Sequence, residues 1–580
     1  RENNTGGFPR GLAYMFGVIR DWIYGYNPID GFRYEEDLAS VKQLHASGGY
    51  FESLIQTYIL DNQHRVAVIL EPDPTLSAHL EEEEQQALIE ARANMSLDDL
   101  EAIVENTRIL KAKQVEPNAP EDLAKLPMLQ ISDLDKDVKT FPIEVEMEDG
   151  NEMLHHDLFT NGIVYFRLGI DLHVIPQDLL PYIPLFGASL TEIGTEKSSY
   201  IQLLQKIGQS TGGVGASEMV NNVRDQEKSL ALFWIYGKST VNQVDKMFNI
   251  MREMLFEVNF DNKERFRQMV LEEKAQEESR LIPAGHAVAL TRLRAIYTEA
   301  NWIAEQMGGL EYLYFLRRLA NEVENNWDDV LAKLKKIQSL LLNRKIMFTD
   351  TTLDQPNYQQ VKPSIIRFLD EMPQAEPVFQ EWAIGSLPAN EGLTVPTQVN
   401  YVSKGVNLYE LGFENHGSLQ VALNLIRTGH LWDKVRMQGG AYGSFIQFNS
   451  RSGLLGFVSY RDPNLSNTLS VYDETADYLR TLSLPQSEVD RAIIGVVGSL
   501  DSYKLPDAKG YTALIHHLHK TTVEERQQRR DEVLSTSLAD IQRFAEAVDE
   551  IKKGRVVVLG SSEAVNGANG GDWMTITQVM

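Results

Sequence analysis

The sequence predicts an α+β fold in which a two-layer α/β unit occurs twice, preceded by a helical hairpin that serves as a linker. Helical and strand patterns alternate along most of the chain, as is typical of mixed α and β domains. The last third of the chain repeats an order of elements seen earlier, namely helix, glycine pair, strands and two helices. With 580 residues the chain is also too long for one hydrophobic core, so several packed units are expected.

The N-terminal part of the chain has the pattern of the end of a domain. Helical patterns cover residues 12–24, 35–45 and 50–60, and a strand pattern at 65–71 stops at Pro72. The chain begins with Arg1 and shows neither an initiator methionine nor the apolar core of a signal peptide. We therefore expect the sequence to continue a longer polypeptide.

A helical hairpin is predicted next. Nearly every position from Ser77 to Gln114 fits a helix, and Ser96-Leu97-Asp98-Asp99 resembles a capping box that starts a second helix. The acidic run 81–84 is interpreted as a solvated helix face. Three prolines between Glu116 and Pro127 end the hairpin.

Two α/β units follow the hairpin. The first is predicted to have strands at 141–147, 162–170, 229–236 and 345–350, helices at 178–193, 241–256 and 262–281, and further helices up to residue 342. After a proline-containing linker at 371–387, the second is predicted to have strands at 398–403, 444–448, 454–460 and 555–560 and a helix at 418–437. The likeness between the units lies in the order of their elements rather than in residue identity, and it indicates a duplicated fold.

The net charge narrows the classes of ligand. The chain carries 82 acidic and 55 basic residues, a formal charge of −27, which repels nucleic-acid phosphates and attracts cationic ligands such as basic peptides. An acidic surface that serves solubility alone is an equally good interpretation. No apolar run approaches the roughly 18 residues that a membrane span requires, so no membrane segment is expected.

The sequence shows no metal-binding motif. It has no cysteine, which excludes disulfides and thiolate zinc sites, and its 12 histidines form neither an HExxH nor an HxxEH pair. His155 and His156 lie at the entry to a strand, while His516, His517 and His519 lie on a predicted helix without a carboxylate at ligand spacing. We interpret these side chains as solvated or locally hydrogen-bonded imidazoles rather than as metal ligands.

The strongest candidate for chemistry is the segment 431–445, LWDKVRMQGGAYGSF. An amphipathic helix carrying Arg436 is predicted to break at Gly439 and Gly440 and to deliver Tyr442 into a strand. A guanidinium and a neutral phenol can both donate hydrogen bonds to a developing oxyanion, and glycines allow another backbone to approach, but neither donor can activate water. The competing interpretation is a helix-end salt bridge for Arg436 and a packed position in the sheet for Tyr442. The turn at 460–464, YRDPN, is interpreted as structural.

Long motifs carry a resemblance to a known family. LWDKVRMQGGAYGSF and SYRDPNL, together with DLFTNGIVYF, PLFGASLTEIGT, IGQSTGGVGAS and DSYKLPDAKGY, resemble the pitrilysin and insulin-degrading-enzyme family of inverted-motif zinc metallopeptidases. The resemblance covers essentially the whole chain. It implies pitrilysin-like metallopeptidase domains, four in the complete enzyme, arranged as a clamshell around a closed chamber.

The resemblance also divides the chain. It implies that residues 1–74 end the second domain, 75–131 form the linking hairpin, 132–370 form a third domain without zinc, and 371–580 form the fourth. The zinc motif HxxEH belongs to a first domain that this chain lacks. The helix from Leu180 to Ile193 takes the place of the zinc helix by internal repetition, but it has no ligands.

By the same resemblance, Arg436 and Tyr442 complete an active site whose zinc is bound by an absent N-terminal half, with Gly439 and Gly440 beside the substrate. The implied substrates are unstructured, often basic peptides, including cleaved organellar targeting presequences, and the implied location is the mitochondrial matrix or the plastid stroma. The partner would be the N-terminal catalytic half, so this chain alone is expected to be inactive, with no nucleic acid or membrane involved. The alternative is a non-catalytic peptide-binding or assembly subunit of the same fold.

Overall fold

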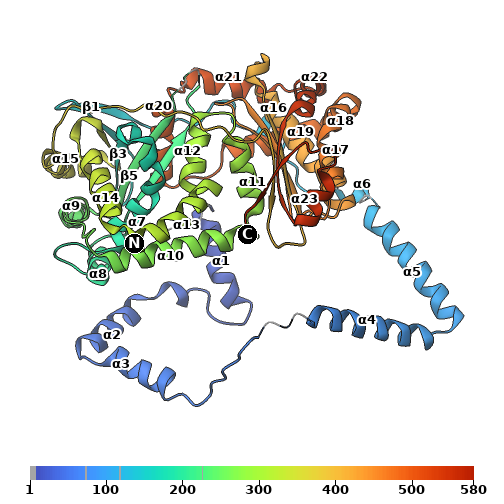
Figure 1. Ribbon diagram of the computed structural model, residues 1–580, viewed down its shortest axis with the longest axis horizontal. Coiled ribbons are helices and arrows are strands. Elements are labelled where there is room, and N and C mark those ends of the chain that lie inside the picture. Colours follow the sequence, from blue (N-terminus) through green and yellow to red (C-terminus); the bar gives the residue numbers. More distant parts are fainter. Residues whose placement is uncertain are drawn as a thin grey trace. The chain divides into compact units, whose positions relative to one another are not determined.

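The computed structural model describes residues 8–71, 73, 75–116, 119–123, 125–224, 226 and 228–580 (Figure 1). The described chain divides into two compact units, Phe8–Leu129 and Gln130–Met580. The division of the chain into the end of a second domain, a linking hairpin, a third domain and a fourth domain remains a prediction. The predicted ranges are 1–74, 75–131, 132–370 and 371–580. None of the helices formed by the described residues is long and apolar enough to cross a membrane.

The unit Phe8–Leu129 is helical. Its elements are α1 (Arg10–Trp22), α2 (Glu35–Ala46), α3 (Tyr50–Ile55) with a π-helical turn (Gln56–Leu60), α4 (Leu76–Ala93), α5 (Leu97–Val115) and α6 (Pro120–Leu123). The predicted helices are therefore confirmed, and Ser96 and Asp99 form the capping box that starts α5. That α4 and α5 form a linking hairpin remains a prediction. The strand predicted at 65–71 is wrong. The pattern of Val66, Val68 and Leu70 suits a strand, but these side chains are 87%, 76% and 92% exposed and no described strand pairs with them.

The unit Gln130–Met580 contains two six-stranded mixed sheets. The first has the order β1-β2-β6-β3-β5-β4. Its strands are β1 (Glu144–Glu148), β2 (Asn151–Asp157), β3 (Ile163–Asp171), β4 (Val214–Asn221), β5 (Leu230–Thr240) and β6 (Met347–Leu353). Strand β2 lies between the strands predicted at 141–147 and 162–170, in a stretch for which no strand was predicted. Its polar residues hide its burial, since Asn151, His155 and His156 are almost fully buried within it.

The second sheet repeats the topology of the first, with the order β12-β7-β11-β8-β10-β9. Its strands are β7 (Asn390–Thr394), β8 (Tyr401–Asn407), β9 (Gly443–Phe448), β10 (Leu454–Tyr460), β11 (Arg555–Gly560) and β12 (Thr575–Gln578). Five strands of each sheet follow the same scheme, in which one parallel pair, β2 with β6 or β7 with β11, adjoins three strands paired antiparallel. The sixth strand differs, because β1 pairs antiparallel with β2 whereas β12 pairs parallel with β7. The prediction of a duplicated α+β fold is confirmed.

Helices cover one face of each sheet and form the two main cores. Around the first sheet these are α7 (Ile183–Glu192), α8 (Tyr200–Ser210), α9 (Val244–Phe256), α10 (Lys263–Arg280), α12 (Glu299–Gly308), α13 (Leu310–Asn325), α14 (Trp327–Leu341) and α15 (Gln355–Asp370). Around the second they are α16 (Ser418–Leu425), α17 (Ser466–Asp473), α18 (Thr475–Thr481), α19 (Gln486–Leu500), α21 (Val523–Leu534), α22 (Leu538–Asp549) and α23 (Ser562–Ala568).

The unit Gln130–Met580 has two halves, one around each sheet, and each half contributes a helix that packs on the sheet of the other half. Helix α11 (Gly285–Arg294), which precedes α12 in the chain, packs on β8, β10 and β11 of the second sheet, the orange and red strands in Figure 1. In return, Leu514 of α20 (Pro506–Leu518) packs with Leu154, Leu232 and Trp234 against the free face of the first sheet. Both sheets are thus covered on two sides, and neither half completes its core alone.

A buried ionic cluster fixes α11 to the second sheet. The guanidinium of Arg292 on α11 donates to Glu391 on β7 at 2.7 and 3.3 Å, to Glu311 at 2.9 Å and to Glu305 at 3.2 Å. Arg292, Glu305 and Glu391 are almost completely buried. One cation against three carboxylates leaves an excess of negative charge in the interior.

Glu305 is completely buried in this cluster. Burial raises the pKa of its carboxyl to about 7, although Arg292 opposes the shift. The folded pKa therefore lies above the ordinary value of 4.5, so this group's contribution to stability is fully present below pH 4.5 and is lost as pH rises through 7.

We predict that Glu305→Gln, which is neutral at every pH, gains stability relative to the unmodified chain as pH rises from 5.5 to 8. The full shift corresponds to on the order of 3 kcal/mol. The measurement is the thermal unfolding midpoint of both proteins across this pH range. Glu264→Gln on the exposed side of α10 is the control, because Arg267 holds the pKa of Glu264 below its ordinary value and no such growth is expected. A constant difference for Glu305→Gln would contradict the prediction.

Candidate active site

The helix that carries Arg436 is wider than an α-helix over its last half. After α16 the chain continues through two π-helical segments, Ile426–His430 and Trp432–Gln438. The predicted helix at 418–437 is therefore confirmed in extent, while its π-helical character was not predicted. Such segments rotate side chains relative to an ideal helix and are frequent at functional sites.

The glycine pair ends this helix for reasons of backbone geometry. Gly440 has φ +80°, a conformation that side chains disfavour, and its N–H donates to the Arg436 carbonyl at 2.9 Å. A Cβ on Gly439 would lie 2.5 Å from the Val435 carbonyl oxygen. The Gly439 carbonyl accepts a hydrogen bond from the Asn464 side chain at 2.6 Å. Contact of either glycine with substrate remains a prediction.

Arg436 is held by stacking rather than by an ion pair. Its guanidinium carbon lies 4.0 Å from the centre of the Trp432 ring, one turn earlier on the same helix. Among the described residues no carboxylate or carbonyl pairs with this guanidinium, so the predicted alternative of a helix-end salt bridge is not what the structure shows. Its donors are available to a ligand.

Tyr442 stands at the start of β9, the edge strand of the second sheet, and its side chain is 68% exposed. Its backbone N–H donates to the Tyr460 carbonyl at 3.1 Å, while its ring meets the Tyr460 ring edge-on, with centroids 5.6 Å apart. Tyr460 in turn contacts the His286 ring of α11 at 4.7 Å. The phenol therefore projects from a supported aromatic stack rather than packing in the sheet.

The turn after β10 anchors the other side of the site. Asp462 is fully buried and accepts hydrogen bonds from the Thr468 hydroxyl at 2.7 Å and the Asn464 N–H at 2.9 Å. Its backbone exchanges two hydrogen bonds with Asn400, at 2.7 and 2.8 Å. Burial raises the pKa of the Asp462 carboxyl, although the Thr468 and Asn464 bonds oppose the shift. The predicted structural role of this turn is confirmed.

His155 and His156 are held by hydrogen bonds within the fold. The ring of His156 lies between the Asp350 carboxylate at 2.6 Å and the Pro142 carbonyl at 2.8 Å, and His155 contacts the Leu353 carbonyl at 2.8 Å and stacks on Tyr358. Their interpretation as locally hydrogen-bonded imidazoles is confirmed. No group of three or more His, Asp or Glu side chains within the described ranges is placed to hold a metal ion, so these residues do not fit a zinc site.

The structure thus brings Arg436, Gly439, Gly440 and Tyr442 together at one end of the second sheet. Residues that sequence reasoning missed are Trp432, which holds Arg436, and Tyr460 with His286, which support Tyr442. A Trp four positions before an Arg on a predicted helix was an available signal. Contact with His286, more than 150 residues away, had no local signal.

Comparisons with known proteins place the chain in a family. Residues 70–319 match the family model of a region associated with M16 peptidases of subfamily C, and residues 390–563 match that of the PreP C-terminal domain. The chain is 41% identical to presequence protease 1, chloroplastic/mitochondrial, of Arabidopsis thaliana over 574 residues, covering 98% of this chain and 53% of that protein. The chain belongs to the M16 peptidase family.

The chain is also similar to a second curated protein and to a solved structure. The chain is 30% identical to the protein HypA of Clostridium perfringens, covering 97% of this chain and 58% of that protein. The solved M16 inactive domain from Pseudomonas fluorescens shares the fold, with a TM-score of 0.53 and 13% identity over 73% of this chain and 98% of that one. This M16 chain spans about half the length of the curated relatives it matches.

We predict that Gly440→Ala lowers the thermal unfolding midpoint, because Ala at φ +80° costs about 1–2 kcal/mol. The control is Gly498→Ala in the last turn of α19, where no atom lies within 4 Å of the added Cβ, and the midpoint should rise slightly. Equal shifts in the two variants would contradict the backbone role given to Gly440.

Proposed function

We propose that this chain is the C-terminal half of a zinc metalloendopeptidase that degrades unstructured peptides, including cleaved targeting presequences, inside a closed chamber. The observation that carries the proposal is that an M16 chain has an available guanidinium, Arg436, and an exposed phenol, Tyr442, on the segment that runs from the π-helical end of a helix to β9. Gly439 and Gly440 are proposed to lie beside the bound peptide.

The proposed role of the two side chains is to hold the carbonyl oxygen of the peptide bond to be cut. Arg436 supplies a fixed positive charge and a fork of N–H donors, and Tyr442 supplies one O–H donor. Donors fixed in advance stabilise negative charge that develops on an oxygen, because they need no reorganisation during the reaction. Neither group is a base at neutral pH, so the two residues orient and polarise the substrate.

Zinc is proposed to be held by an N-terminal half, outside this chain. Family membership supports a metal centre in the complete protein, and the described residues of this chain offer no cluster that would bind one. The partner of this chain is then the half that carries the zinc ligands.

The proposed substrates are basic, flexible peptides, and the proposed location is the mitochondrial matrix or the plastid stroma. The net charge of −27 favours cationic peptides over nucleic acids. The location is supported by the names of the Arabidopsis relative and of a mitochondrial presequence protease of Saccharomyces cerevisiae, which is 27% identical.

We predict that Tyr442→Phe, in the polypeptide that carries both halves, lowers kcat on a basic peptide by roughly 100-fold to 1000-fold, because one oxyanion donor is lost. Tyr503→Phe is the matched control, because this exposed tyrosine lies outside the candidate site, and its kcat should not change. An unchanged kcat in Tyr442→Phe would contradict the catalytic role and favour a binding or assembly subunit.

We also predict that the 580-residue chain alone neither retains zinc after desalting nor cleaves a basic peptide. Addition of an N-terminal half that contains an HxxEH motif should restore both properties. The measurements are metal content by mass spectrometry and cleavage of a fluorogenic peptide. Cleavage by the chain alone would overturn the division of the active site between two halves.

A further inference from the structure

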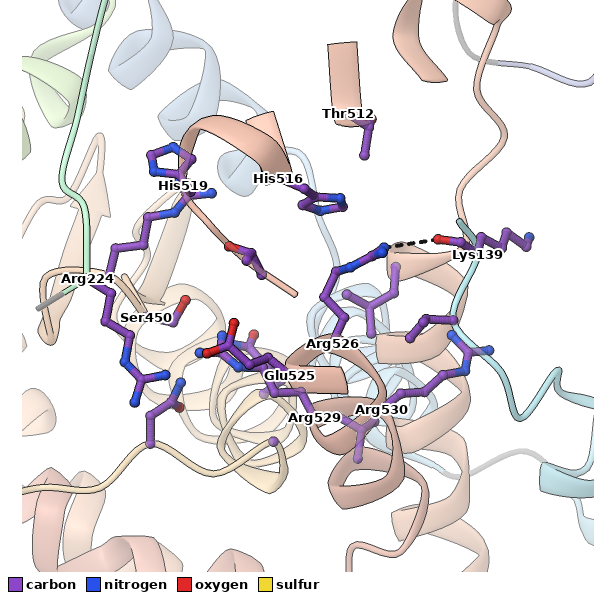
Figure 2. A pocket seen from close by; sticks show the side chains of 18 of the residues that line it. Lys139, Arg224, Ser450, Thr512, His516, His519, Glu525, Arg526, Arg529 and Arg530 are labelled. Atoms are coloured by element: carbon purple, nitrogen blue, oxygen red, sulfur yellow. Dashed lines mark hydrogen bonds between the residues drawn. The ribbon is translucent and has the colours of Figure 1, made fainter. Parts of the chain in front are cut away.

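A cavity of about 680 Å³ in the unit Gln130–Met580 is strongly basic, although the chain as a whole is acidic (Figure 2). It lies among α20, α21, the start of α16, the turn between β9 and β10, and the segment around Lys139. Of the described residues that line it, eight are Lys or Arg and two are acidic. A concentration of like charge without a structural counter-ion opposes folding, so it indicates a ligand.

Some of these cations serve the structure. Arg530 is buried and forms a two-pronged ion pair with Asp501, at 3.0 and 2.7 Å, and the side chain of Lys139 donates to the Asp501 carbonyl at 3.2 Å. The Asp501 carboxylate is thus neutralised by Arg530. Glu525 caps the start of α21, because its carboxylate accepts a hydrogen bond from the Thr522 N–H at 3.1 Å. The acidic residues of the lining are therefore engaged in local contacts.

Other cations have no counter-charge among the residues that the structure describes. Arg451, in the β9–β10 turn, and Arg529, on α21, pair through their guanidinium groups with none of the described residues. Arg526 donates to the Lys139 carbonyl at 3.1 Å, but its Nε is buried without an acceptor in the described chain. Burial lowers the pKa of the Arg451 guanidinium, and the neighbouring Arg529 adds to the shift.

A buried histidine gives independent support for a ligand. His519, at the end of α20, is only 7% exposed, and both of its ring nitrogens are buried without a hydrogen-bond partner among the described residues. It lines the cavity together with His516 (Figure 2). Burial lowers the pKa of both imidazoles to about 4, and the neighbouring Arg451 adds to each shift. An imidazole N–H so placed lacks an acceptor that an anion would supply.

We propose that this cavity binds a small multivalent phosphate-type anion through the guanidinium groups of Arg451, Arg526 and Arg529. Planar guanidinium forks match the oxygens of phosphate groups, and the volume lies within the range of small-molecule sites and exceeds the needs of a single phosphate. Basic peptides are repelled from it, so the site is separate in chemistry from the proposed substrates. An anion here bridges α20, α21 and the β9–β10 turn.

The test is isothermal titration calorimetry on the full 580-residue chain at pH 7 and constant ionic strength, with inorganic pyrophosphate as the probe. Inorganic phosphate tests the need for more than one phosphate group, and citrate tests a preference for carboxylates. Pyrophosphate should bind at least tenfold more tightly than either. Arg451→Gln and Arg529→Gln should each weaken its binding at least tenfold, whereas Arg491→Gln, an exposed arginine of α19, should change it less than twofold.

Thermal unfolding without ligand separates loss of binding from loss of fold. Because Arg451 and Arg529 repel each other, each Gln variant should unfold at the same temperature as the unmodified chain or higher. Absence of pyrophosphate binding, unchanged affinity in both variants, or tighter binding of citrate would overturn the proposal. A lower unfolding midpoint in both variants would also overturn it, since it would show that these arginines stabilise the fold.

Discussion

The buried cluster around Arg292 is the interaction on which the arrangement of the unit Gln130–Met580 depends. It fastens α11, which belongs to the first half of the unit by sequence, to β7 of the second half. Removing Arg292 from this cluster would leave buried carboxylates without a counter-charge and cost several kcal/mol, so the position of α11 is well defined. The packing of α20 on the first sheet is apolar, so it buries hydrophobic surface but does not by itself fix the orientation of the helix. Together they make two repeated folds into one body.

The fixed position of α11 also constrains the candidate site. Tyr442 rests on Tyr460, and Tyr460 rests on His286 of α11, so the position of the phenol is linked to the first half of the unit as well as to its own strand. On the other side, the π-helical widening sets Arg436 on Trp432, and the Asp462 turn holds the carbonyl of Gly439 through Asn464. A flexible pair of donors would lose much of its effect on an oxyanion, whereas donors on a rigid frame keep it.

Much of the fold followed from periodicity, and most misses have one cause, which is that local pattern says little about burial by distant elements. The glycine pair, the helix before it and the strands after it were predicted because their signals are local. Strand β2 was missed because its two histidines look like surface residues in the sequence. In the fold, the imidazoles of His155 and His156 are buried and form hydrogen bonds with β6 and with the segment before β1. The strand at 65–71 was predicted in error because a strand pattern does not supply a partner. The contact of Tyr460 with His286 and the basic cavity depend on geometry that no spacing shows.

Because α11 and α20 each pack on the sheet of the other half, the fold cannot be completed until late in synthesis of the chain. A ribosome completes the first sheet when it reaches Leu353, but the helix that covers the sheet's free face ends at Leu518, 165 residues later. At the usual 5–20 residues per second of synthesis, Leu154, Leu232 and Trp234 stay uncovered for roughly 10–30 seconds. During that interval the nascent chain presents an apolar sheet face to its surroundings, so this polypeptide has the profile of a client for chaperones that act at the ribosome.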